Sequence, residues 1–345
     1  MIRECCHSPI ASSRSRTAAW STNDRVSASA CACRGRPRSG PTERGSAMSL
    51  RAELLRLGIR FFLKRGTHHL DIETWRKDMR ATEKFVPRPP ARSQTTKVNA
   101  GRLTFHRVTT EASRAERHVL YLHGGAYVSG APAYYRHFTW RIADAVKASV
   151  WALEYRLAPE HPFPAALEDA VAGYHWLLDN TPDTRRLFVM GDSAGAGLAL
   201  CLLLKLRDDG RPLPAAAVAM SPWTDLALTG LSLTSNAAAD PMLNADDLPE
   251  LARYYLAGAD PRTPYASPLY GDPAGLPPVM IQVGSDEILA DDAIRMAEKL
   301  RQHNPRTRLE IWPRMPHVWQ LFVPVLPEAH RAIAQIGEFI ASVGG

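Results

Sequence analysis

From about residue 102 to the C-terminus, short apolar runs alternate with longer stretches in which apolar residues recur at helical spacing. A short, partly β-branched apolar run predicts a buried strand, whereas a period of three to four residues predicts a helix. Strands are predicted at residues 118–123, 150–154, 187–190, 215–220, 279–283 and 309–312, and helices at residues 134–147, 165–179, 194–207, 291–302 and 327–342. This alternation predicts an α/β fold with a mostly parallel sheet and helices on both faces. Active sites in such folds lie at the carboxyl ends of the strands.

The pattern changes in two regions, which we interpret as a helical cap. Between about residues 226 and 264 the chain has helical spacing with no strand beside it. Residues 48–86 also carry helical patterns, and they precede a proline-rich stretch at 87–101 that predicts a linker. We therefore expect N-terminal cap helices at 48–86 and a core at 87–345 with a cap insertion at about 226–264.

The first cap helix is predicted to be amphipathic and basic. Its apolar residues Leu50, Leu54, Leu57 and Phe61 fall on one face, and its basic residues lie largely elsewhere. Such a helix can cover a pocket or lie on a membrane surface. We expect it to cover a pocket, because the segments that follow it are not basic.

Residues 1–47 differ in composition from the rest of the chain. They hold eight arginines and three acidic residues, which is a charge of +5 out of the formal +7 of the whole chain. The segment has no apolar core of a secretory signal and no periodic apolar face, so we expect a disordered leader or a start-site artefact. The remaining chain is close to neutral, which argues against a nucleic acid as a partner.

The cysteines follow the same division. Four of the five lie in residues 1–47, at a spacing that matches no common zinc site, and Cys201 lies among the leucines of a predicted helix. We expect no disulfide framework and no metal site, and a reducing, cytoplasmic location. The chain has no run of about 18 apolar residues, so no stable membrane insertion is expected.

Ser193 lies between a predicted strand and a predicted helix, within the sequence MGDSAGAG. Its neighbours Gly191, Ala194 and Gly195 are small, as a sharp turn between a closely packed strand and helix requires. Such a turn exposes the hydroxyl at a helix N-terminus, where free N–H groups stabilise a developing negative charge. The G-x-S-x-G pattern alone also fits a plain glycine-rich turn, so its context must decide.

A second glycine-containing turn, His123-Gly124-Gly125-Ala126, ends the strand predicted at 118–123. Adjacent glycines let backbone N–H groups face a cavity, as an oxyanion requires, although an ordinary tight turn has the same composition. Upstream of a serine turn in an α/β chain, the oxyanion function is the better interpretation.

A serine nucleophile needs a base, and the base needs an acid that orients it. The chain order in this fold is serine, acid, histidine. Asp286 and Glu287 follow one strand predicted after Ser193, and His317 alone among the histidines directly follows the last predicted strand. Neighbouring residues of an extended segment point in opposite directions, so only one of the two acids can face the imidazole.

The chain resembles the bacterial hormone-sensitive-lipase family of α/β-hydrolase esterases, in particular its GDSAG branch. The segments that carry the resemblance are, in order, HGGAYVSG, EYRLAPEHPFPAALEDA, GDSAG, SPWTDL, YASPLYGD, PPVMIQVGSDEILADDA and MPHVWQLF. The resemblance runs from about residue 49 to the C-terminus and implies an α/β-hydrolase fold with a helical cap. It implies Ser193 as the nucleophile, His317 as the base, and the amides of Gly124, Gly125 and Ala194 as the oxyanion hole.

The resemblance also selects an acid. In this family the acid stands three residues after a glycine and four before the first acid of a D-D or D-E pair, and counting from Gly284 and from Asp291 leads to Glu287. Two departures from the family pattern are Ala126 in place of the third glycine of HGGG, and a glutamate where many members have aspartate. Alanine retains its N–H, so the first departure should be mild. Relatives commonly associate through the last strand and helix, which makes a homodimer an expectation.

Together these features predict a carboxylic ester hydrolase that acts through a Ser-Glu-His triad and an acyl-enzyme, with no metal or organic cofactor. The resemblance implies a small-molecule ester substrate with short to medium acyl chains of about C2 to C8. An amidase or peptidase with the same triad is an alternative, because nothing in the sequence separates ester from amide substrates. A non-catalytic ligand-binding protein on this fold is the other alternative, although it would be expected to lack a triad residue.

Overall fold

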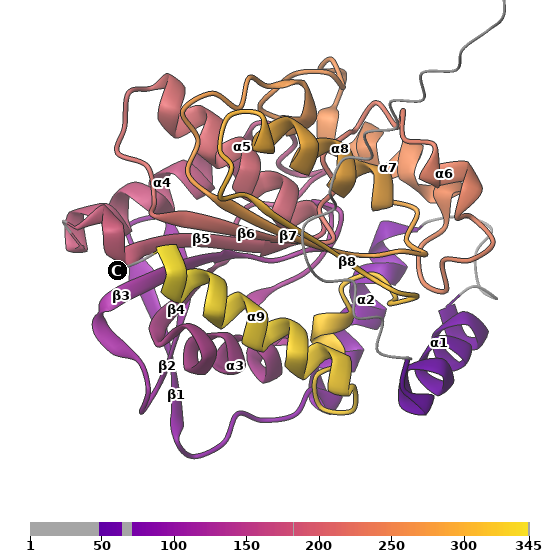
Figure 1. Ribbon diagram of the computed structural model, residues 1–345, viewed down its shortest axis with the longest axis horizontal. Helices are drawn as coiled ribbons and strands as arrows, with labels where there is room; N and C mark the ends of the chain where they lie inside the picture. Colours follow the sequence, from indigo (N-terminus) through magenta and orange to yellow (C-terminus); the bar gives the residue numbers. More distant parts are fainter. Residues whose placement is uncertain (1–47, 64–70, 182, 344–345) are drawn as a thin grey trace, which may run out of the picture. The chain divides into compact units, whose positions relative to one another are not determined.

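The computed structural model describes residues 48–63, 71–181 and 183–343 (Figure 1). The leader expected at residues 1–47 lies outside the described residues. The described part of the chain forms an eight-stranded sheet in the order β1-β2-β4-β3-β5-β6-β7-β8. Its strands are β1 (Ser93–Ala100), β2 (Leu103–Thr110), β3 (Arg114–Leu122), β4 (Ala148–Leu153), β5 (Leu187–Asp192), β6 (Ala216–Met220), β7 (Val279–Gly284) and β8 (Arg308–Trp312). All pairs from β4 to β8 are parallel, so the mostly parallel sheet is confirmed.

The first two strands are the part of the sheet that the apolar pattern does not predict. β1 pairs antiparallel with β2, and β2 pairs antiparallel with β4. The assignment of residues 87–101 to a linker is therefore wrong for residues 93–100. β1 reads SQTTKVNA and is mostly exposed. A polar strand at the edge of an antiparallel pair has no apolar run that could mark it.

Helices cover both faces of the sheet, as Figure 1 shows. One face carries α3 (Arg136–Val146) and α9 (Pro327–Val343), and the other carries α4 (Ala165–Asn180), α5 (Ala194–Asp208) and α8 (Ala290–Arg301). Within β3, Val119 and Tyr121 belong to the first of these two cores, and Leu120 and Leu122 to the second. Side chains alternate across a strand, so a strand covered on both faces must be apolar throughout.

α5 begins directly after Ser193 and is enclosed on all sides. Twelve of its fifteen residues are buried, Cys201 among them. It packs on β5 and β6 of the sheet and against α4. A helix that is apolar around its circumference is stable only when it is surrounded in this way. The start of α5 is therefore a rigid support for Ser193.

Four helices in the described part of the chain lie outside these layers. They are α1 (Leu50–Leu63) and α2 (Ile72–Thr82) before the sheet, and α6 (Ser232–Ser235) and α7 (Leu248–Leu256) between β6 and β7. Figure 1 shows all four at one end of the sheet. Short 3-10 turns are η1 (Glu83–Phe85), η2 (Pro132–Tyr135), η3 (Thr184–Arg186), η4 (Ala245–Asp247), η5 (Pro268–Tyr270) and η6 (Trp319–Phe322). Of the helices described, none has the length and apolarity to cross a membrane.

α1 does not pack with the face that its sequence favours. The four residues of its apolar stripe are 51–76% exposed, whereas Ala52 and Ile59 on the other side are buried. Arg56 also faces the core, where it donates to the carbonyl oxygen of Arg314 and pairs with Asp286 at 2.8 Å. The apolar stripe is therefore not the docked face of α1, and polar contacts fix the orientation of this helix. That the helix covers a pocket stays a prediction.

Candidate active site

Ser193 forms the sharp turn between β5 and α5. Its φ of 53° and ψ of −123° lie outside the favoured regions for a residue with a side chain. The turn brings strand and helix into close approach: a Cβ on Gly191 would lie 2.3 Å from the carbonyl oxygen of Gly195. A Cβ on Gly195 would lie 2.2 Å from the carbonyl oxygen of Leu122. The small residues of the motif are therefore required by packing, and the strained turn presents the serine hydroxyl.

His317, in the loop after β8, contacts Ser193. Its Nε2 lies 2.9 Å from the serine Oγ, and its Nδ1 lies 2.7 Å from Oε2 of Glu287. A carboxylate can only accept, so Nδ1 carries the proton in the neutral imidazole and Nε2 accepts from the serine hydroxyl. Burial disfavours the imidazolium, but the hydrogen bond and charge of Glu287 outweigh burial and raise the pKa of His317 above 6.5.

The two adjacent acids point in different directions, although they lie in a turn, in which the amide of Glu287 donates to the carbonyl oxygen of Gly284, and not in the extended segment that the sequence argument assumes. Glu287 is fully buried, and its Oε1 accepts from the amide of Gly284 at 2.6 Å. Asp286 instead pairs with Arg56 of α1 and accepts from the hydroxyl of Ser285 at 2.9 Å. The structure thus brings Glu287, and not Asp286, together with His317 and Ser193.

Ser221, directly after β6, joins the loops that carry the acid and the histidine. Its hydroxyl donates to Oε1 of Glu287 at 2.8 Å and accepts from the amide of Val318 at 3.1 Å. It is fully buried and has a φ of 47°, which is costly for serine. Sequence reasoning missed Ser221, because a lone serine has no spacing pattern. Two signals could have drawn attention to it: its place at the carboxyl end of a central strand, and its position as the first residue of SPWTDL, one of the segments that carry the family resemblance.

Gly124 does not have the free amide that the resemblance implies. Its N–H is shared between Oδ1 of Asp192 and the hydroxyl oxygen of Tyr135, at 3.0 Å each. An amide held by a buried carboxylate is not available to an oxyanion, so the assignment of Gly124 to the oxyanion hole needs correction. The sequence could not reveal this, because the competing acceptor lies on another strand.

Three other amides near Ser193 make no hydrogen bond with any residue that the structure describes. They belong to Gly125, Ala126 and Ala194. Gly125 has a φ of 120°, and a Cβ there would lie 2.1 Å from the carbonyl oxygen of Ser129. Ala126 also has a positive φ, 53°. Gly125 and Ala194 were candidates from the sequence, whereas Ala126 was named only as a departure from a family pattern.

Asp192 ties the serine turn to the glycine-containing loop. It precedes Ser193, and its carboxylate accepts from Tyr121 at 2.6 Å and from Tyr135 at 3.1 Å, besides the Gly124 amide. Burial raises the pKa of Asp192 to about 6, although these hydrogen bonds act in the opposite direction. Asp192 therefore positions the loop through groups that are themselves buried.

His123, which precedes the glycine-containing loop, is buried beside the site. The imidazole of His123 stacks on Tyr155 with ring centroids 4.3 Å apart, and burial lowers its pKa to about 4. Within the described ranges, no group of three or more His, Cys, Asp or Glu side chains could hold a metal ion. The four cysteines of residues 1–47 lie outside those ranges.

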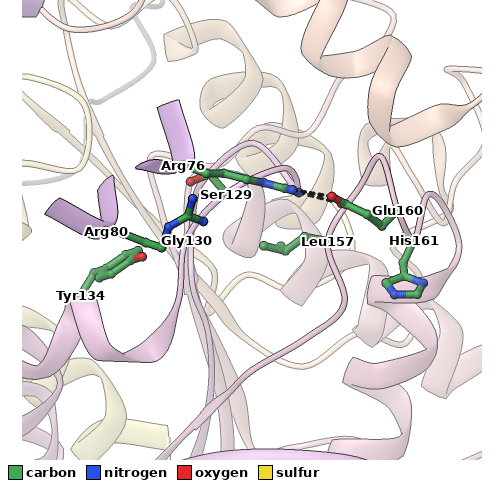
Figure 2. A pocket seen from close by; sticks show the side chains of 8 residues that line it. All are labelled: Arg76, Arg80, Ser129, Gly130, Tyr134, Leu157, Glu160 and His161. Carbon is green, nitrogen blue, oxygen red and sulfur yellow. Dashed lines mark hydrogen bonds and ion pairs between the residues drawn. The ribbon is translucent and has the colours of Figure 1, made fainter. Parts of the chain in front are cut away.

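A cavity of about 380 Å³ lies beside the glycine-containing loop (Figure 2). Its lining comes from α2, from the loop after β3, and from the loop after β4: Arg76, Arg80, Ser129, Gly130, Tyr134, Leu157, Glu160 and His161. Figure 2 shows Arg76 and Glu160 joined across it. The cavity thus lies where a cap helix meets the loop that contains Gly125 and Ala126.

The sequence of this chain is similar to those of proteins with known activities. The sequence profile of a family described as alpha/beta hydrolase fold matches residues 119–321. The chain belongs to the α/β-hydrolase family. This hydrolase is 51% identical over 229 residues to an acetyl-hydrolase of Streptomyces hygroscopicus, covering 66% of this chain and 77% of the relative. It is 36% identical over 226 residues to an esterase of Acinetobacter venetianus, covering 65% of this chain and 75% of the relative.

Solved structures narrow the group within the family. An esterase/lipase from an uncultured bacterium superposes with a TM-score of 0.82 at 40% identity, covering 86% of this hydrolase and 99% of that chain. An esterase from the bacterial hormone-sensitive lipase family superposes with a TM-score of 0.81 at 40% identity, covering 87% of this hydrolase and 100% of that chain. The α/β-hydrolase fold and the predicted enzyme class are confirmed: the hydrolase is an esterase of the hormone-sensitive-lipase-like group.

Proposed function

We propose that this esterase hydrolyses carboxylic esters through a triad of Ser193, His317 and Glu287. The observation that carries the proposal is an unbroken hydrogen-bond chain from the serine hydroxyl, through both imidazole nitrogens, to a buried carboxylate. His317 takes the serine proton as Oγ attacks the ester carbonyl, and returns it to the leaving alkoxide. The same imidazole then activates the water that hydrolyses the acyl-enzyme.

Glu287 orients the imidazole and stabilises the imidazolium in this scheme. Its Oε1 is occupied by Ser221 and Gly284, which leaves Oε2 for His317. The raised pKa of His317 supports this assignment, because it reflects a charge that favours the protonated ring. Ser221 is then a positioning residue that holds Glu287 and the loop of His317 at fixed positions relative to each other.

The oxyanion hole in this proposal consists of the amides of Gly125, Ala126 and Ala194. Ala126 replaces Gly124, whose amide donates to Asp192. Ala194 is the first residue of α5, where the helix N-terminus favours negative charge. Loss of one such donor costs about 10²–10³ in kcat, so the position of this loop should limit the rate strongly.

The substrate in this proposal is a small-molecule ester with a short to medium acyl chain. Two curated relatives are named acetyl-hydrolase and esterase, which favours short acyl groups. We assign substrate enclosure to a cap made of the helices at 48–86 and the insertion at about 226–264. The homodimer and the cytoplasmic location stay predictions.

The test uses p-nitrophenyl esters of increasing acyl length, matched p-nitroanilides, and labelling by a fluorophosphonate. We expect labelling at Ser193, highest kcat/KM between about C2 and C8, and a loss of about 10⁴–10⁶ in kcat for Ser193→Ala. Anilides cleaved as fast as the matched esters would favour the amidase alternative. Ester hydrolysis that survives Ser193→Ala would refute the proposal.

A further inference from the structure

The cap helix α2 is held to the rest of the protein by few apolar contacts. Among its residues, all of which the structure describes, Ile72 is the one that is buried. Its first turn is capped by Asp71, which accepts from the amides of Glu73 and Thr74. A helix of eleven residues depends on tertiary contacts for its stability. Besides the apolar contacts of Ile72 and of the partly buried Trp75 with the core, these contacts include several hydrogen bonds from Arg76, in the middle of the helix.

Arg76 joins α2 to two loops at once (Figure 2). Its Nε donates to the carbonyl oxygen of Val128 at 2.6 Å, and Nη2 donates to that of Ala158 at 2.7 Å. Nη1 and Nη2 also donate to the two oxygens of Glu160 at 2.6 and 2.8 Å. Four of its five N–H groups are therefore engaged, and the side chain is only 13% exposed.

The Val128 carbonyl belongs to a strained part of the chain. Ala126 and Tyr127 have φ values of 53° and 64°, and consecutive left-handed residues other than glycine persist only where surrounding contacts hold them. The Tyr127 carbonyl accepts from the amide of Ala158 at 2.9 Å. Because Arg76 binds the carbonyls of both Val128 and Ala158, it closes a ring of hydrogen bonds around this turn.

We propose that Arg76 is a positioning residue for the oxyanion hole, coupling the cap helix α2 to the chemical step. The inference rests on the proposed function, since it concerns the amides of Gly125 and Ala126. Without Arg76 the ring opens, the strained turn relaxes, and the two amides lose their orientation toward the developing oxyanion. Ground-state binding depends less on these amides, so the rate of the chemical step should fall more than the affinity for substrate.

Arg80 provides a matched control in the same helix and the same cavity. It lies about one turn after Arg76 and beside Tyr134 in Figure 2. Its side chain is exposed and makes no hydrogen bond or ion pair with any residue that the structure describes, while its carbonyl oxygen accepts from the amide of Glu83 as part of the helix end. Arg80→Gln therefore removes the same charge from α2 without opening the ring.

The experiment compares Arg76→Gln, Arg76→Lys, Glu160→Gln and Arg80→Gln on p-nitrophenyl acetate, with rates expressed per active site titrated by a fluorophosphonate. Arg76→Gln should lower kcat by about 10- to 100-fold and change KM by less than about threefold. Arg76→Lys should recover part of the rate, because an ammonium can still bind a carbonyl. Glu160→Gln leaves both carbonyl contacts and should cost less than about fivefold, and Arg80→Gln less than about twofold.

A trifluoromethyl ketone, which forms a tetrahedral oxyanion adduct with the serine, measures the oxyanion hole directly. Its inhibition constant should rise in Arg76→Gln by the factor that kcat/KM loses. A purely structural role would lower Tm and leave both quantities per titrated site unchanged. That result, or an equal loss in Arg80→Gln, would overturn the proposal. Activity that survives Ser193→Ala would instead refute the proposed function, which keeps the two failures distinct.

Discussion

The cap contacts the two sides of Ser193 in different ways. On the histidine side, Arg56 of α1 pairs with Asp286, one residue away from the proposed acid, while Glu287 itself is held by Ser221, Gly284 and His317. On the oxyanion side, Arg76 of α2 binds the loop directly. The histidine side is therefore supported by the ends of central strands, whereas the oxyanion loop is held by Asp192 of β5 at Gly124 and by the cap helix α2 at Val128. We therefore expect a polar contact from the cap to affect catalysis only where it binds a segment of the site directly.

Among the residues around Ser193 that this comparison concerns, the largest effect should follow from Glu287→Gln. A glutamine can also donate to Nδ1, which permits the wrong imidazole tautomer, so kcat should fall by about 10²–10⁴ with KM little changed. In the wild type, kcat/KM should fall as the pH drops through the raised pKa of His317, because the imidazolium cannot act as a base. Removing the Glu287 charge should move this acid limb to lower pH. A pH-rate profile of both proteins checks this, and an unmoved limb would contradict it.

The second effect concerns stability on the oxyanion side. Burial raises the pKa of Asp192 from 3.8 to about 6, so the folded state holds this proton more tightly than the unfolded chain does. The contribution of Asp192 to the unfolding free energy is therefore lost as the pH rises from about 4 to 6. Above that range, the side chain is ionised in both the folded and the unfolded state, and the loss is complete. Relative to Asp192→Asn, which cannot titrate, the wild type should lose about 2 kcal/mol of unfolding free energy between pH 4 and 8.

Denaturant unfolding of both proteins at several pH values measures this difference. The substitution also changes the hydrogen bonds of Tyr121 and Tyr135, but that offset does not depend on pH in this range. A difference in unfolding free energy between the two proteins that does not change with pH, or that favours the wild type as the pH rises, would contradict the raised pKa of Asp192.

Ser221→Ala should give a smaller effect on the histidine side. It leaves the buried Val318 amide without its acceptor and removes one donor from Glu287. The unfolding free energy should fall by about 1–3 kcal/mol, and kcat should fall by about tenfold because the acid is less firmly held. Ser285→Ala is the control, since it also removes a serine hydroxyl that accepts from one amide, that of Arg314, and donates to one carboxylate, that of Asp286, but at an exposed site. Equal losses of unfolding free energy and kcat in both variants would show that Ser221 is not a positioning residue.

The sequence predicts the core better than it predicts the cap. Central strands such as β5 and β6 are buried on both faces, so their apolar runs are unambiguous. β1 is polar and half in water, and it was missed for that reason. The apolar stripe of α1 predicted a buried face, but Arg56 docks the opposite face through contacts with segments more than 200 residues away, as the bond to Arg314 shows. Periodicity along one helix contains no information about such partners.

Within the candidate site, the sequence predicts those residues whose position along the chain, relative to strands and to other motifs, indicates their role. Ser193 and His317 were selected from strand ends and chain order, and the structure brings them to hydrogen-bond distance. Gly124 was misassigned because an amide's partner is decided in three dimensions, here by Asp192 on β5. Ser221 lies in the segment SPWTDL, but no spacing rule assigns it a role. Residues that touch the reacting atoms are thus easier to find from sequence than the residues that hold them.

A weaker effect is expected where the cap reaches only Asp286. Asp286→Asn and Arg56→Gln both remove the ion pair with α1, yet Glu287 keeps its three partners in the core. Each variant should lower kcat for p-nitrophenyl acetate by less than about tenfold, well below Glu287→Gln. Steady-state kinetics per titrated site provide the measurement. If Asp286→Asn cost more than Glu287→Gln in folded protein, the acid would be Asp286 and the comparison of the two sides would fail.

The smallest effect is expected on the exposed stripe of α1. Leu54 and Leu57 are 60% and 63% exposed, so Leu54→Gln and Leu57→Gln remove little buried area and should change the unfolding free energy by less than about 0.5 kcal/mol each. Ile59 lies on the docked face at 8% exposure, and Ile59→Ala should cost about 2 kcal/mol because it leaves a cavity. Denaturant unfolding of these variants distinguishes the docked face of α1 from its exposed face. If the leucine variants were destabilised as much as Ile59→Ala, the stripe would be the docked face, and the arginine contacts would not be what fixes α1.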